Sequence, residues 1–475
     1  MEKLPSTIKE CHEIIRLLLD KLEGFSKRIE ALELECAQLR TENTQLKERL
    51  NNNSSNSSLP PSKSVKKKKN TRQPSGKASG GQKGHKGHYR ELLPTAEVDS
   101  IKYCELTHCH CGGKVRKTGD FLRHQIHELP EIRLHVTEYQ LEKGSCVSCG
   151  KKHIARLPAG VTWGITGYRL TSLMSNLVTE YGLSRRELTR FLKEHLQFNL
   201  SLGSVFNKQK LVNAALEAPV LALLPVIKES HSIHADETGH NRDGSNQWLW
   251  AFISKTAAFF SIQASRGKKV LSAMMGDFKH IVVSDRYAGY NLFDSDNRQL
   301  CWAHLKRDFT KLSEKDNEVL AKIGKSLLVC ESELFNTWHL FREGQLTRFE
   351  LQRQAAPIRK RVGELLEQGS YTDPALRVAR FCKNILENFN ALWTFLERDG
   401  VEPTNNHAER SLRPLVIWRK KYFFTRSDYG SEYVARSASF NTTCKLQGRS
   451  IFTTLCILME NTFYGQDSSA ILMTT

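Results

Sequence analysis

The chain has 475 residues, too many for a single hydrophobic core, so several modules are expected. Its 70 Lys and Arg against 51 Asp and Glu give a formal net charge of +19, which favours nucleic acid over an acidic membrane surface as partner. The charged, periodic N-terminus excludes a signal peptide, and we find no run of about 18 apolar residues that could span a membrane. The 12 cysteines then indicate metal ligands and buried thiols rather than disulfides, so we expect a cytoplasmic, nucleoid-associated protein.

Residues 1–50 carry a heptad pattern that is typical of a coiled coil. One position of its apolar seam holds Leu22, Ile29, Cys36, Asn43 and Leu50, and the other holds Leu18, Phe25, Leu32, Leu39 and Leu46. The polar Asn43 in the seam favours two parallel strands. We predict that this helix dimerises; the alternative is a single amphipathic helix packed on its own domain.

Residues 51–94 have the composition of a flexible basic linker. Residues 51–58 are mostly Asn and Ser, Lys66–Lys69 are consecutive lysines, and residues 80–88 are rich in Gly and His. Such a composition cannot form a packed core. We expect its lysines to contact DNA phosphates without sequence preference, although a solvated tail is the alternative.

Two cysteine clusters lie in residues 95–160, on either side of a segment, 133–139, that alternates like a strand. We predict a small β unit closed by a structural Zn²⁺ ion, because a segment this short needs a metal to fold. The expected ligands are Cys109, Cys111, Cys146 and Cys149, with Cys104 or His108 as alternatives in the irregular first cluster. A metal-free reduced unit is the alternative.

Residues 161–228 favour short helices, which we expect at 170–174, 184–192 and 201–212. Ser184 and Glu187 have the spacing of a capping box. One interpretation is a helix-turn-helix that binds DNA through Lys208 and Lys210, and the other is a helical spacer. Both stay open at the level of the sequence.

From residue 229 the pattern changes to strands, expected at 232–236, 247–254, 257–264, 281–285 and 300–302, with a helix at 268–276. This order is the ribonuclease-H-like arrangement. It places Asp236 on the first strand and Asp285 at the end of the fourth, while Glu237 should point to the opposite face. The core would comprise residues 229–305 and 400–462, interrupted by an all-helical insertion at 306–399 and followed by a tail at 463–475. The fold class is therefore multidomain α+β.

A helix that begins near Ala408 carries a further acid, Glu409, among basic residues. Two aspartates at strand ends and a distant glutamate supply the hard oxygen ligands that two-metal phosphoryl transfer requires. These three acids, with the boxes Cys301-Trp302-Ala303-His304 and Asn405-Asn406-His407-Ala408-Glu409-Arg410, resemble the DDE transposases of the insertion sequence 66 family. The resemblance covers nearly the whole chain.

The resemblance implies a bacterial transposase that binds the terminal inverted repeats of an insertion element and catalyses strand cleavage and strand transfer. Asp236, Asp285 and Glu409 would be catalytic and would hold two Mg²⁺ ions, with Mn²⁺ able to substitute. Its partners would be double-stranded DNA, a second copy of the chain or a higher oligomer, and accessory proteins of the same element. The residues expected to contact DNA are Lys208, Lys210, His304, Lys306, Arg307, His407, Arg410, Arg413, Arg419 and Lys420.

Two other functions fit parts of the sequence. The main alternative is a zinc-dependent DNA-binding protein with an inactive nuclease-like core, and the presence of all three acids argues against it. An RNA-cleaving ribonuclease H is the second, but it has no evident use for the heptads, the cysteine clusters and the insertion.

Overall fold

The computed structural model describes residues 7–53, 56, 86–87, 90–106, 109–372 and 377–473. Most of the expected linker, including Lys66–Lys69, and the alternative ligand His108 lie outside these residues. The chain divides into two compact units. The first comprises Met1–Lys67, Glu138–Glu194 and Phe198–Thr475, and the second comprises Lys68–Thr137 and His195–Gln197. The described elements are of mixed α and β type, as the sequence predicts.

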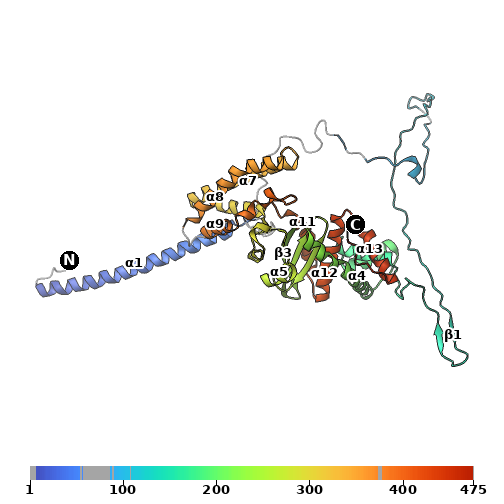
Figure 1. Cartoon of the computed structure of the whole chain (residues 1–475), viewed down its shortest axis with the longest axis horizontal. Helices are drawn as coiled ribbons and strands as arrows, with labels where there is room; N and C mark the ends of the chain where they lie inside the picture. Colours follow the sequence, from blue (N-terminus) through green and yellow to red (C-terminus); the bar gives the residue numbers. More distant parts are fainter. Residues whose placement is uncertain are drawn as a thin grey trace. The chain divides into compact units, whose positions relative to one another are not determined.

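Helix α1 (Ile8–Asn51) covers the heptad region as one continuous helix (Figure 1). Its seam is open to solvent, with Leu22 62%, Phe25 61% and Ile29 56% exposed. The predicted helix is therefore confirmed. The described part of the same chain leaves these regularly spaced apolar side chains uncovered. A coiled-coil partner would bury them, and dimerisation through this helix stays a prediction.

A five-stranded sheet forms the centre of the first unit, in the order β5-β4-β3-β6-β7. Strands β3 (Ser232–Arg242), β4 (Ser245–Ile253) and β5 (Ala258–Gln263) are antiparallel neighbours. Strands β6 (Ile281–Ser284) and β7 (Arg298–Leu300) run parallel to β3. Strand β3 extends beyond its predicted end at 236 because it pairs with β4 up to the turn Asp243-Gly244. Both turn residues have positive φ, 47° and 86°, the conformation that suits a twisted hairpin.

Helices cover both faces of this sheet. Because successive strand residues point to opposite faces, Trp250 and Phe252 enter one apolar cluster, while Leu249 and Ala251 enter another. The first cluster includes residues of α4 (Leu202–Glu229) and α13 (Ile451–Tyr464). The second includes Ala408 and Leu412 of α11 (Asn406–Tyr422) and residues of α12 (Asp428–Leu446). Helix α11 is thereby fixed against the face that Ala251 occupies.

The helices before the sheet are α2 (Tyr168–Thr179), α3 (Arg185–Leu196) and α4. The capping box of α3 is confirmed, since Glu187 N–H donates to Ser184 Oγ at 3.1 Å and Ser184 N–H donates to Glu187 Oε2 at 2.6 Å. Helix α4 runs to Glu229 instead of ending at 212, with Pro219 and Pro225 inside it. Among the described helices α4 alone is long and apolar enough to cross a membrane by length and composition, a property that buried core helices share. Its buried Val212, Leu216 and Leu223 belong to the core cluster, which accounts for the apolar composition.

The expected insertion is entirely helical in its described part. It consists of α6 (Trp302–Ser313), α7 (Glu318–Arg342), α8 (Arg348–Ser370), α9 (Arg377–Glu387) and α10 (Thr394–Glu397), and Figure 1 shows α7, α8 and α9 gathered together. Its core is continuous with the sheet, because Ile281 and Val283 of β6 join the same apolar cluster. A short helix, α5 (Lys268–Met275), lies between β5 and β6 as predicted. The expected tail is docked, since Leu472 is 1% exposed in the core cluster of the sheet.

The expected zinc unit has less secondary structure than predicted. The described residues include an antiparallel hairpin of β1 (Lys143–Ser145) and β2 (Lys152–Ile154), with the C-x-x-C sequence in its turn. The predicted strand at 133–139 is wrong: these residues carry no regular secondary structure, and Val136 is 84% exposed. A strand needs a neighbour to pair its backbone groups, and alternation alone does not provide one.

Candidate active site

Asp236 and Asp285 occupy matching positions on neighbouring strands. His234 of β3 lies opposite Val283 of the parallel strand β6, and each aspartate follows two residues later along its own chain. Adjacent strands are about 4.8 Å apart, so this register brings the two carboxylates to one edge of the sheet. Asp236 also lies opposite Ala251 of β4, on the face that α11 covers.

The environment of the two aspartates favours a bound cation. Burial raises the pKa of Asp236 well above its usual value. Repulsion from Glu237, Asp285 and Glu409 raises this pKa further. Backbone N–H groups hold both side chains, from Glu237 to Asp236 Oδ1 at 2.9 Å and from Tyr287 to Asp285 Oδ1 at 2.8 Å. A divalent ion would relieve the repulsion, and carboxylate oxygens are the ligands that Mg²⁺ prefers, so these residues fit magnesium.

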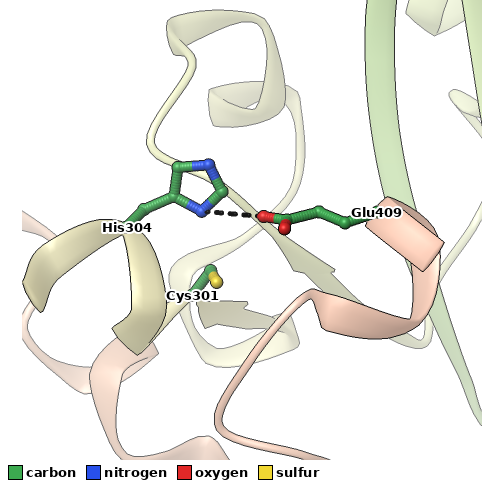
Figure 2. A group of neighbouring side chains, drawn as sticks. All are labelled: Cys301, His304 and Glu409. Atoms are coloured by element: carbon green, nitrogen blue, oxygen red, sulfur yellow. Dashed lines mark ion pairs between the residues drawn. The ribbon is translucent and has the colours of Figure 1, made fainter. Parts of the chain in front are cut away.

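Glu409 lies in the first turn of α11, and two residues of α6 face its carboxylate. Its Oε1 is 3.7 Å from His304 Nδ1 and 3.8 Å from Arg307 Nη2. Figure 2 shows the His304 imidazole and the Glu409 carboxylate directed toward each other across the space between the two helices. Arg410 and Arg413, which the sequence places close to Glu409, are exposed in the structure.

Asn405 fixes the start of α11 to the sheet. It is 0% exposed, and its Nδ2 donates to the Ala235 carbonyl of β3 at 2.8 Å. Its Oδ1 lies 3.1 Å from His234 Nδ1, which must carry the proton because an amide oxygen only accepts. Burial, with the nearby His407, lowers the pKa of His234 to about 4, so this imidazole is neutral near pH 7. The Asn405 carbonyl accepts from Glu409 N–H at 3.2 Å, which links the acid's helix to β3.

Cys301 connects the same segment to α6. The thiol is 1% exposed, and its Sγ accepts the Asn405 N–H at 3.1 Å. Burial raises the pKa of Cys301 to about 11. The ligating atoms of Cys301, His304 and Glu409 all lie within 4.8 Å of one another, and this is the one such group of three among the described residues. The sequence predicts Cys301 to be a small buried residue, which is confirmed, but gives no sign of this cluster.

Glu237 lies on the other face of β3, as predicted. Its side chain is 3% exposed and pairs with Arg266 at 2.8 Å, while the Tyr290 hydroxyl donates to it at 2.6 Å. Burial raises the pKa of Glu237 to about 7, against the opposing effect of these partners. It is a structural acid behind the site.

Several of the basic residues that we expect to contact DNA are paired with other groups or partly buried in the structure. Lys306 donates to the buried carboxylate of Glu331 at 2.9 Å. Arg419 donates to Thr238 Oγ1 on β3 at 2.8 Å. Lys208 is half-buried, and burial lowers its pKa. His304 and Arg307 are half-buried and face Glu409, His407 is half-buried, and Lys210, Arg410, Arg413 and Lys420 are exposed.

Each cysteine cluster brings its own pair of thiols together. In the hairpin turn, backbone N–H groups and the Cys149 thiol lower the pKa of Cys146. In the other cluster, the Gly113 backbone and the Cys109 thiol lower the pKa of Cys111. Cys104 is exposed. Because the two clusters belong to separate compact units, a zinc ion shared between them stays a prediction.

Sequence reasoning missed two buried polar residues of the site, Asn405 and Arg298. Arg298 is 2% exposed and donates to Asn291 Oδ1 at 2.9 Å. Burial lowers the pKa of Arg298 to about 10, and the charge of Asp285 partly offsets this effect. A lone arginine in a short strand gives no signal of burial. Asn405 precedes α11 but its side chain does not cap that helix, so its bonds to β3 and His234 had no signal in the sequence.

Comparisons with known proteins identify a family for this chain. Residues 165–433 match the family model described as "Transposase IS66 family", and residues 5–91 match a family of unknown function. Three relatives from Sinorhizobium fredii (strain NBRC 101917 / NGR234) are each described as an uncharacterized protein. The protein y4qI is 26% identical over 55% of this chain and 53% of its own length, so the match spans about half of that relative. The proteins y4hP and y4jD are 23% and 22% identical over 72% and 75% of this chain, and 68% and 74% of their own lengths.

Proposed function

The chain belongs to the IS66 family of transposases, and from this premise we propose that it binds the terminal inverted repeats of an insertion element and catalyses DNA cleavage and strand transfer. The single observation that carries the proposal is the placement of the acidic residues. Asp236 and Asp285 occupy matching positions on parallel neighbouring strands, and the charge of Glu409 acts on Asp236.

The sheet supports a ribonuclease-H-like core. Three antiparallel strands are followed by a helix and by two strands parallel to the first, and the helical insertion separates Asp285 from the helix of Glu409. This arrangement would bring the three acids toward one end of the sheet although they are distant in the sequence. The presence of all three acids argues against the alternative of an inactive nuclease-like core that only binds DNA.

The side chains around the cluster have distinct roles in the proposed reaction. Asp236, Asp285 and Glu409 would hold two Mg²⁺ ions, which, when bound, supply activation of a water or 3′-hydroxyl and stabilise charge on the phosphorus. Arg307, beside Glu409, can donate to a phosphate oxygen in a planar geometry. Asn405 positions Glu409 through its bonds to β3.

Other parts of the chain would serve DNA binding and assembly. The exposed Arg410, Arg413 and Lys420 of α11 suit the DNA backbone, and the net charge of +19 strengthens non-specific binding. We place a dimer contact on α1, a structural zinc ion on the cysteine clusters, and the protein on DNA in the bacterial cytoplasm. The helix-turn-helix role of α3 and α4 stays a proposal, and Gln209 of α4 is unavailable for base contact because it accepts from Arg185 at 2.7 Å.

The test is cleavage of a labelled element end by the purified chain in the presence of Mg²⁺. Asp236→Asn, Asp285→Asn and Glu409→Gln should each abolish the nick at the terminus and keep DNA binding within about twofold, since the changes remove metal ligands and not DNA contacts. Glu432→Gln, which neutralises an exposed acid on α12, is the matched control and should cleave normally. Cleavage near the unmodified rate by any of the three variants would remove that residue from the metal site.

A further inference from the structure

We propose that Cys301, His304 and Glu409 form a second metal site, selective for a borderline ion such as Zn²⁺ over Mg²⁺. When this site is occupied, Glu409 is withdrawn from the magnesium site. The part that concerns catalysis rests on the proposed function, whereas the binding of zinc does not.

The first observation is the relation between the imidazole and the carboxylate. His304 Nδ1 is buried and has no hydrogen-bond partner, although Glu409 Oε1 faces it (Figure 2). Their separation of 3.7 Å is too long for a hydrogen bond. In a tetrahedral site, an ion that lies about 2.0–2.2 Å from a nitrogen and an oxygen holds the two atoms about 3.3–3.6 Å apart, so the observed 3.7 Å needs only a slight approach. The unsatisfied Nδ1 and its distance to Oε1 therefore fit a bridging ion.

The second observation is the sulfur. The Cys301 Sγ lies within 4.8 Å of both other ligand atoms, so a small side-chain rotation completes three positions of a tetrahedron. Cys301 is the residue directly before α6 and His304 lies in the first turn of that helix, so their spacing keeps both ligands on one short segment. The donor set of sulfur, nitrogen and oxygen disfavours Mg²⁺ and suits Zn²⁺.

The surroundings of the cluster also suit a metal-bound thiolate. The Asn405 N–H donates to Sγ at 3.1 Å, which is how backbone groups outside the ligand shell support such a sulfur. A thiolate and a carboxylate together balance the charge of a divalent ion. Among the described residues, Arg307, 3.8 Å from Glu409 Oε1, is the guanidinium at this carboxylate that opposes the ion, and its flexible side chain can turn toward solvent.

One carboxylate cannot serve both ions at full strength. Zinc at this site therefore competes with magnesium for Glu409, and the expected effect is reversible inhibition of cleavage by micromolar Zn²⁺ in millimolar Mg²⁺. The fourth zinc position is left to water or to a phosphate oxygen, as in zinc sites with three protein ligands.

The experiment measures zinc bound to the full chain by equilibrium dialysis after chelator treatment, with Zn²⁺ alone as the probe. The unmodified chain should bind one more ion than Cys301→Ser and one more than His304→Gln. The second variant keeps the test valid if the first fails to fold. Cys382→Ser is the matched control, because that thiol is also fully buried, burial also raises its pKa to about 11, and it belongs to no ligand group among the described residues. Any zinc on the other cysteines contributes equally to all four proteins. Equal stoichiometry in all four overturns the site.

Cleavage separates this inference from the proposed function. Relative to its own zinc-free rate, each site variant should need at least tenfold more Zn²⁺ for half-inhibition than the Cys382→Ser control. If the unmodified chain binds the extra ion but never cleaves, the proposed function fails and the zinc site stands. If the unmodified chain and both site variants are half-inhibited at the same Zn²⁺ concentration, the competition for Glu409 is refuted.

Discussion

Asn405→Ala tests whether a buried amide holds the catalytic helix in place. The change removes two side-chain hydrogen bonds, at 2.8 Å to the Ala235 carbonyl and 3.1 Å to His234 Nδ1. It leaves both partners buried and unsatisfied, and each such group costs about 1–3 kcal/mol, so the free energy of unfolding should fall by about 2–6 kcal/mol. The start of α11 also loses its tie to β3, and a displacement of about 1 Å at a reacting site can lower the rate about 10²-fold.

Two measurements check this prediction. Guanidinium unfolding followed by tryptophan fluorescence reports on the core, where Trp250 and Trp302 are fully buried. Cleavage of an element end, measured under conditions where the variant is folded, reports on the site. The matched control is Asn406→Ala, because that neighbouring residue is exposed and should change stability by less than about 0.5 kcal/mol. The reasoning is refuted if the Asn405 and Asn406 variants unfold at the same denaturant concentration and cleave equally well.

Three further predictions follow from the charges, the heptads and the cysteines. Since the folded state raises the pKa of Asp236, the stability of the metal-free protein should fall as pH rises above about 3.8. Asp236→Asn should therefore raise the melting temperature of the metal-free protein at pH 7 and remove the stabilisation by Mg²⁺. A lower melting temperature for this variant would contradict the prediction. A fragment of residues 1–50 should sediment as a helical dimer, and Asn43→Leu should stabilise it while loosening its oligomeric state; a monomer at high micromolar concentration would exclude the coiled coil. A fragment of residues 95–160 should bind one Zn²⁺ and lose its structure with chelator, and Cys146→Ser should prevent both zinc binding and folding. If the fragment folds equally well without metal, the cysteines are ordinary thiols.

Local patterns in the sequence determined the elements and the acids of the site. Runs rich in apolar residues predicted the strands of the sheet, whose two faces are both covered by helices, although β3 continues to Arg242 beyond its expected end at 236. The heptads of α1 and the capping box of α3 were evident because each depends on residues a few positions apart. The one strand expected from alternation without a partner, at 133–139, did not form.

Only the tertiary structure decided what surrounds those acids. The bond between Asn405 and His234 joins residues 171 positions apart, and Glu409 meets His304 and Arg307 across the whole helical insertion. Strand register sets which residues on β3 and β6 lie side by side, and burial turns Arg298 and Glu237 into parts of the core. These features depend on the packing of distant segments, whose contacts have no spacing along the chain. The sequence therefore determined which residues could do the chemistry, and the packing of α6 and α11 against the sheet decided which of them meet.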